Sequence, residues 1–177
     1  VDFPLPVSAD IDSEVVGKGL SDGPPSILVT TLDNAGLKED DFYCFGLTAD
    51  LISDIARAGS IRVVPMTTML QSLVSGGSPE AAAARTGVRF LLKGSLRSRD
   101  GSFHLSVDLF DTGSGALVWM DSWEDSREEL NSIKGKLADG ILKVLGVQPG
   151  SFPGITSPVG STSSACEMYL RARHIWR

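Results

Sequence analysis

The feature that most constrains the fold is a run of three strand patterns separated only by tight-turn sequences. In the central pattern, SFHLSVDLF, apolar and polar residues alternate, which is the period of a strand with one buried and one solvated face. The residues expected to face inward are Phe103, Leu105, Val107 and Leu109, and those expected to face solvent are His104, Ser106 and Asp108. Asp100-Gly101 before this strand and DTGSG after it are typical turn sequences. The chain is therefore expected to form an antiparallel meander here.

The two flanking patterns complete this meander. In VRFLLKGSLRSR, four apolar residues are expected to share one face: Val88, Phe90, Leu92 and Leu96. In ALVWMDSW, we expect Leu117, Trp119 and Trp123 on one face. Cross-strand packing of the two tryptophans is favoured over a ligand platform, because aromatic pairs commonly stabilise sheets in this way.

Upstream of the meander, the pattern predicts a strand, a helix and a second strand. SILVTTL, from Ser26, is apolar on both faces, and IRVVP is a short strand closed by Pro65. Between them, Leu47, Leu51, Ile52 and Ile55 recur at helical spacing. The opposite, solvent-facing side of this helix is expected to carry Asp50, Ser53, Asp54 and Arg57, and the helix is expected to end near Gly59. Such a unit predicts a right-handed crossover with parallel strands.

Two short helices and a longer closing helix account for the rest of the domain. MTTMLQSLVSGG predicts the first, and SPEAAAARTG the second, with Ser78 as N-cap, Pro79 in the first turn and Gly87 as the stop. The closing helix is expected from about Ser126 to Leu145 and to end at Gly146, with Gly135 and Gly140 either weakening it or allowing close packing. Its apolar positions are Leu130, Ile133, Leu137, Ile141, Leu142 and Leu145. The fold class is α/β with a mixed sheet.

Composition divides the chain into four segments. Residues 1–25 and 149–163 are rich in Pro, Gly and Ser and are expected to be linkers on either side of a domain spanning residues 26–148. Residues 164–177 predict the first helix of a truncated helical repeat region.

Charge and hydropathy exclude two classes of partner for this chain. The net charge of −6 comes without a basic stripe, so nucleic-acid binding is not expected. No uninterrupted apolar run of about 18 residues occurs, so direct membrane insertion is not expected either. Cys44 and Cys166 are too few and too far apart for a disulfide framework and are expected to be thiols.

The sequence predicts no catalytic, cofactor-binding or metal-ligating residue and no cofactor. His104 and His174 lack metal-ligand spacing, and VVGKGLSDG has Gly-Lys without the preceding strand that a phosphate loop needs. DTGSGA joins two strands instead of opening a helix, and the acidic runs KEDD and WEDSREE are expected to be solvated. The chain is expected not to be an enzyme.

The order of these strings resembles the TolB amino-terminal-like domain that precedes tetratricopeptide repeats in many bacterial proteins. The resemblance covers residues 24–177 and rests on PSILVTTLDN, FGLTADLISDIARAGSIRVVP, GVRFLLKGSLR, FHLSVDLFDTGSGALVW, IKGKLADGILKVLGVQ and ACEMYLRARHIWR. The loop DNAGLKEDDFYCFGL lacks the family's Ser-Gly-Asp-Pro stretch, so a function of that loop does not carry over. The resemblance implies an effector domain in the same polypeptide, either a class III adenylate cyclase or a winged-helix transcription regulator.

The leading segment VDFPLPVSADIDSE is similar to the connector that follows soluble cyclase domains, which implies a cytoplasmic cyclase parent. An upstream transmembrane helix would instead make the domain a periplasmic accessory domain.

Three functional hypotheses remain at this stage. The first is a scaffold that binds protein partners or associates with itself, as a homodimer, through a strand edge or sheet face. The second is a small-ligand sensor whose pocket lies at the carboxyl ends of the first two strands, where residues 33–46 and 66–78 converge. The third is an accessory enzyme.

Overall fold

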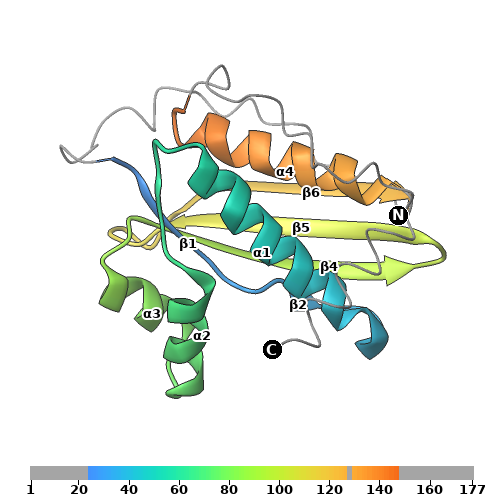
Figure 1. Ribbon diagram of the computed structural model, residues 1–177, viewed down its shortest axis with the longest axis horizontal. Coiled ribbons are helices and arrows are strands. Elements are labelled where there is room, and N and C mark those ends of the chain that lie inside the picture. Colours follow the sequence, from blue (N-terminus) through green and yellow to red (C-terminus); the bar gives the residue numbers. More distant parts are fainter. Residues whose placement is uncertain (1–23, 127–128, 148–177) are drawn as a thin grey trace, which may run out of the picture.

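The computed structural model describes residues 24–126 and 129–147, which form a mixed sheet with helices on both faces (Figure 1). The strands are β1 (Ser26–Val29), β2 (Asp33–Asn34), β3 (Arg62–Val63), β4 (Phe90–Arg99), β5 (Ser102–Asp111) and β6 (Leu117–Ser126). The helices are α1 (Asp41–Arg57), α2 (Met66–Val74), α3 (Pro79–Thr86) and α4 (Leu130–Val144), with one 3-10 turn at Lys38–Asp40. The predicted α/β class with a mixed sheet is confirmed. The expected linkers and repeat helix lie almost entirely outside the described residues.

The sheet order is β3-β1-β4-β5-β6, with β2 also beside β4. β1 lies parallel to both β3 and β4, and the pairs β4–β5 and β5–β6 are antiparallel. The predicted strand–helix–strand unit and the predicted meander are therefore both present.

The first strand is shorter than predicted and resumes after a break. Val29 pairs with Leu92, and Asp33 pairs with Ser95, so β1 and β2 use one more residue than β4 over this stretch. At the break the Leu32 N–H leaves the ladder and donates to Thr48 Oγ1 of α1 at 3.0 Å. A side-chain hydroxyl thus takes over a hydrogen bond that a continuous strand would have made.

The helices cover the two faces of the sheet unequally. α1 and α4 pack over one face, called here the first face, together with the inward side chains of β5 (Figure 1). On the second face, α2 and α3 pack over β1 and the start of β4. Beyond them, the second face of β5 and β6 carries the exposed side chains of Leu117 and Met120, at 48% and 62% exposure. The predicted alternation of β5 is confirmed.

Three further details of the predicted strands and helices differ from the structure. Val88 precedes β4 and packs in the second-face cluster instead of with Phe90. An irregularity of the β5–β6 register next to Leu109 pairs Leu117 with Phe110, so Leu117 does not share a face with the tryptophans. Ser126, the expected helix start, belongs to β6.

The cap of α3 follows the prediction from sequence. The Ala81 N–H donates to Ser78 Oγ at 3.1 Å, Pro79 occupies the first turn, and Gly87 ends the helix with a left-handed φ of 60°. These contacts fix α3 over β4, which matters for the pocket described below.

The two glycines of α4 should respond oppositely to alanine. A Cβ at Gly140 would lie 2.9 Å from Cζ2 of Trp119, whereas a Cβ at Gly135 would meet no described atom within 4 Å. We expect Gly135→Ala to stabilise the protein by about 0.5–1 kcal/mol, because alanine loses less backbone entropy in a helix. We expect Gly140→Ala to destabilise it by about 1 kcal/mol, because overpacking against Trp119 outweighs that gain. Urea denaturation of both variants measures the two signs, and stabilisation by Gly140→Ala would contradict the close packing.

Candidate functional site

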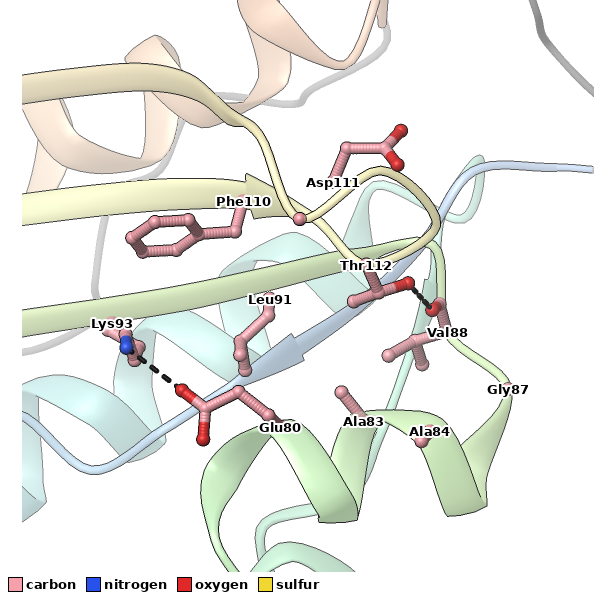
Figure 2. Close-up of a pocket in the computed structure, with 11 residues that line it drawn as sticks. Glu80, Ala83, Ala84, Gly87, Val88, Leu91, Lys93, Phe110, Asp111 and Thr112 are labelled. Atoms are coloured by element: carbon pink, nitrogen blue, oxygen red, sulfur yellow. Dashed lines mark hydrogen bonds and ion pairs between the residues drawn. The ribbon is translucent and has the colours of Figure 1, made fainter.

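A pocket of about 630 Å³ opens on the second face of the sheet, between α3 and the adjoining ends of β4 and β5 (Figure 2). Its lining residues are Glu80, Ala83, Ala84, Gly87, Val88, Leu91, Lys93, Phe110, Asp111, Thr112 and Gly115. The volume is within the range of small-ligand sites and is also ample for an inserted side chain.

The floor of the pocket is apolar because of the local sequence of α3. Its EAAAA run places Ala83 and Ala84 toward β4, where larger side chains would fill the space. Leu91 and Val88 are buried beneath them, and the half-buried ring of Phe110 closes the side next to β5. An apolar group entering the pocket would therefore meet an apolar surface.

One end of the pocket carries a salt bridge. Lys93 Nζ lies 3.0 Å from Glu80 Oε1 and 4.8 Å from the centroid of the Phe110 ring (Figure 2). The hydrogen bond from Lys93 is the first cause that lowers the pKa of Glu80, with backbone and Ser78 contacts adding to it. Both side chains are more than a third exposed, so this pair adds little to stability. Its effect is to hold both charges at the rim.

The other end is formed by the β5–β6 turn. Thr112 Oγ1 donates to the carbonyl of Val88 at 2.6 Å, which ties the turn to the start of β4 (Figure 2). Asp111 Oδ1 accepts from the N–H groups of Gly113 and Ser114, and Asp111 Oδ2 accepts from Arg89 Nε at 3.2 Å. Burial opposes ionisation of Asp111, yet these hydrogen bonds together lower its pKa.

The acidic groups of the pocket are ionised and paired with cations. The lowered pKa values keep Glu80 and Asp111 ionised near neutral pH, so neither is poised as a general acid. Each of them is bonded to a neighbouring cation, and the Thr112 hydroxyl donates to the carbonyl of Val88. A ligand would therefore meet the apolar floor of the pocket, with the Glu80–Lys93 ion pair at one end and the Asp111–Arg89 ion pair at the other.

The pocket lies away from the position that the sequence predicted. None of its lining residues comes from residues 33–46 or 66–78, where a sensor pocket was expected. Sequence reasoning missed it because its walls combine α3 with the β5–β6 turn, which are brought together only by the sheet. The alanine run of α3 beside a strand rich in large residues was the available signal.

The remaining candidate residues lie in separate places. His104 is exposed on β5 near Ser106 Oγ, and His174 lies outside the described residues. Within the described part of the chain, no group of three His, Cys, Asp or Glu residues could hold a metal ion. Trp119 and Trp123 share a face and pack against the first-face core, as predicted. Their ring centroids lie 6.0 Å apart, but both belong to β6 and oppose Leu109 and Leu105, so the aromatic contact is within one strand and not across strands as expected.

Cys44 lies inside α1 and is buried. Its burial, reinforced by the charges of Asp41, Asp40 and Asp33, raises the pKa of the thiol to about 12. The thiolate that would act as a nucleophile is thus scarce at neutral pH.

A buried charge cluster between α1 and α4 was not predicted. Asp54, expected to face solvent, is 7% exposed, because α4 packs along this side of α1. Lys134 Nζ lies 3.2 Å from Asp50 Oδ2 and 3.9 Å from Asp54 Oδ2. That Asp54 oxygen has no hydrogen-bond partner among residues 24–126 and 129–147. Burial is the first cause that raises the pKa of Asp54, and Lys134 and Arg57 oppose it.

None of the helices in residues 24–126 and 129–147 is long and apolar enough to cross a bilayer.

Comparisons with known proteins give one similar sequence and several similar folds. No family model matches the chain. The chain is 24% identical over 127 residues to putative adenylate cyclase 3 of Rhizobium meliloti, and the match covers 70% of this chain and 21% of that protein. The chain thus spans about a fifth of the curated relative that it matches.

Among solved structures, lipoprotein GNA1162 of Neisseria meningitidis aligns with a TM-score of 0.52 at 17% identity over 70% of this chain and 97% of that one. TolB of Acinetobacter baumannii aligns at 0.49 with 14% identity over 75% of this chain and 30% of that chain. The C-terminal domain of LpoB of Escherichia coli aligns at 0.47 with 20% identity over 64% and 94%. The likeness to GNA1162 concerns the fold alone.

Proposed function

We propose that this chain is a non-catalytic interaction domain of a larger bacterial signalling protein, in which it accompanies an adenylate cyclase. The observation that carries the proposal is the match of 127 residues to a fifth of putative adenylate cyclase 3. A domain that forms so small a part of its relative is expected to act on, or beside, a separate catalytic domain. The proposal puts the domain in the cytoplasm, where a cyclase finds its ATP.

The pocket supports a role through contact. Its charged groups are bonded to each other, and its floor is apolar, as in sites that receive an apolar side chain of a protein partner. We infer that a side chain of the effector domain or of another protein enters this pocket. The wider architecture that the sequence resemblance implies, with helical repeats downstream, belongs to the same proposal.

The test fills the pocket in the full-length polypeptide that contains this chain. Ala84 lines the pocket and is exposed, so Ala84→Trp should fill it without disturbing the core. Ala81→Trp, on an exposed position of α3 that does not line the pocket, is the matched control. We expect Ala84→Trp to change the rate of cyclic AMP formation about fivefold or more, and Ala81→Trp to leave it unchanged.

Two outcomes would contradict parts of the proposal. If the full-length polypeptide formed no cyclic AMP from ATP, the proposal that this domain accompanies an adenylate cyclase would be wrong. Equal rates of cyclic AMP formation in the wild type and the Ala84→Trp variant would show that the pocket is not the point of contact. Thermal denaturation of both variants shows whether α3 remains folded.

A further inference from the structure

We propose that the open edge of β6 binds an extended, basic segment of a partner protein as an additional strand of the sheet. This surface is separate from the pocket, and nothing in the proposal depends on the pocket or on a cyclase. It rests on three observations: which backbone groups of β6 face away from the sheet, a carboxylate that accepts a hydrogen bond from one of these N–H groups, and the negative charge of the strand.

β6 is the last strand of the sheet and runs for ten residues, from Leu117 to Ser126. Among the described residues, no strand pairs with its outer side. An edge of this length presents a row of backbone donors and acceptors and is the usual site at which a foreign strand adds. The opposite edge of the sheet, β3, has only two residues and offers no comparable template.

The register of the meander identifies which groups face outward. Asp100 and Gly101, with φ values of 50° and 82°, form a two-residue turn, so the flanking Arg99–Ser102 pair is hydrogen bonded. Hydrogen-bonded pairs then alternate along each ladder. Since Ser102, His104 and Ser106 direct their backbone groups to β4, the intervening β5 residues bond to β6. The residues of β6 whose N–H and C=O groups point to the open edge are Met120, Ser122, Glu124 and Ser126.

One of these edge groups is occupied by a side chain. The Ser122 N–H donates to Asp121 Oδ1 at 2.8 Å, so a carboxylate oxygen lies where the carbonyl of an added strand would lie. An incoming strand would take over this N–H, and the released Asp121 carboxylate would then accept a cation from that strand. The local hydrogen bond satisfies this one N–H group in the absence of a partner.

The charge of β6 selects the partner. The strand carries Asp121, Glu124 and Asp125 and has no lysine or arginine. Asp125 is bound by Lys136 of α4 at 2.7 Å, whereas no described cation pairs with Asp121 or Glu124. These two carboxylates are three residues apart and therefore lie on opposite faces of the sheet. A complementary strand has basic residues three positions apart, one for each face.

The same charges disfavour a second copy of this chain. Two β6 edges would bring together two acidic strands without any cation of their own, and like charges on neighbouring strands are destabilising. The partner chemistry is therefore a basic extended segment, which binds more tightly at low ionic strength.

The experiment uses a labelled decapeptide, Thr-Val-Thr-Lys-Val-Thr-Lys-Val-Thr-Val, and a matched peptide with glutamate at both lysine positions. Binding to the 177-residue chain is followed by fluorescence anisotropy at low and high salt. We expect the lysine peptide to bind, with affinity falling as salt rises, and the glutamate peptide not to bind.

Two variants of the chain localise the binding. Ser122→Pro removes an edge N–H that no strand of the sheet uses, so the fold should survive, as prolines are tolerated at such positions. It should weaken binding of the lysine peptide about tenfold or more, while Ser122→Ala, which keeps the N–H, should change it less than about twofold. Glu124→Lys should weaken binding of the lysine peptide and strengthen that of the glutamate peptide, whether or not Ser122→Pro folds.

Several results would overturn this proposal. Unchanged binding to Glu124→Lys, or to a folded Ser122→Pro variant, would exclude the edge as the binding site. If light scattering showed a dimer and Ser122→Pro dissociated it, the occupant of the edge would be a second copy of the chain and not a basic segment. The Ala84→Trp variant should bind the lysine peptide as the wild type does. The peptide experiment therefore tests the β6 edge even if the proposal for the pocket is wrong.

Discussion

Replacing Lys134 with methionine should destabilise the protein by about 3 kcal/mol at neutral pH, because the change takes the most buried neighbouring cation away from buried Asp54 and half-buried Asp50. Lys134 is 10% exposed and lies between Asp50 and Asp54, and within the part of the chain that the structure describes one oxygen of Asp54 already lacks a hydrogen bond. Methionine keeps the length and the apolar contacts of the side chain, so the loss reports on charge. Urea denaturation at neutral pH measures it.

The loss should shrink as the pH falls. The pKa of Asp54 is raised above its ordinary value of 3.8, first by burial, so the native state binds this proton more tightly than the unfolded state. Stability therefore decreases as the pH rises from 3.8 through the raised pKa. Removing Lys134 takes away an effect that lowers this pKa and extends the unfavourable range to higher pH. Adding Asp54→Asn to the Lys134→Met variant should recover most of the lost stability. If Lys134→Met alone lowered the stability by less than about 1 kcal/mol, the ion pairs of Lys134 would be screened by solvent, contrary to this prediction.

Gly94→Ala should cost about 3 kcal/mol, although alanine is ordinarily the better residue in a strand. A Cβ at Gly94 would lie 2.7 Å from the backbone oxygen of Ser106, 2.7 Å from Leu32 Cδ2 and 2.9 Å from Val107 Cγ1. The backbone oxygen cannot move without displacing β5, so the clash has to separate two central strands. Chemical denaturation provides the measurement.

A suitable control for this substitution is Gly113→Ala in the β5–β6 turn. There the nearest atom to an added Cβ is Asp111 Oδ1 at 3.3 Å, and we expect a change of about 0.5 kcal/mol or less. Equal effects at the two positions would mean that β4 and β5 can separate to accept a methyl group, contrary to the close approach of their backbones.

Local signals predicted much of this fold. The alternation of SFHLSVDLF specified the buried face of β5, and Ser78, Pro79 and Gly87 specified the limits of α3, because each of these patterns acts within a few residues. Features that depend on distant segments were missed. Asp54 is polar and occupies the polar stripe of α1, but α4, 80 residues further along the chain, covers that stripe and supplies Lys134.

The pocket could not be located from the sequence for the same reason. Its floor combines residues of α3, β4 and the end of β5, and only the sheet order brings these together. The sequence predicted contacts through a strand edge or a sheet face and did not identify β6. Which backbone groups of β6 face outward depends on the Asp100-Gly101 turn and on the strand pairing that follows it. The hydrogen bond from the Ser122 N–H to Asp121 could be seen only in the structure.

The position of β1 between β3 and β4 also has a consequence for how the chain reaches this structure. β1 bonds to β4 across a long stretch of sequence, and the Thr30 hydroxyl reaches the carbonyl of Leu92 over 62 residues. The β4–β5–β6 meander closes through short turns instead and needs no other part of the chain to begin pairing. During synthesis β1 and α1 leave the ribosome before β4, so the apolar side chains of β1 lack this pairing partner until β4 follows.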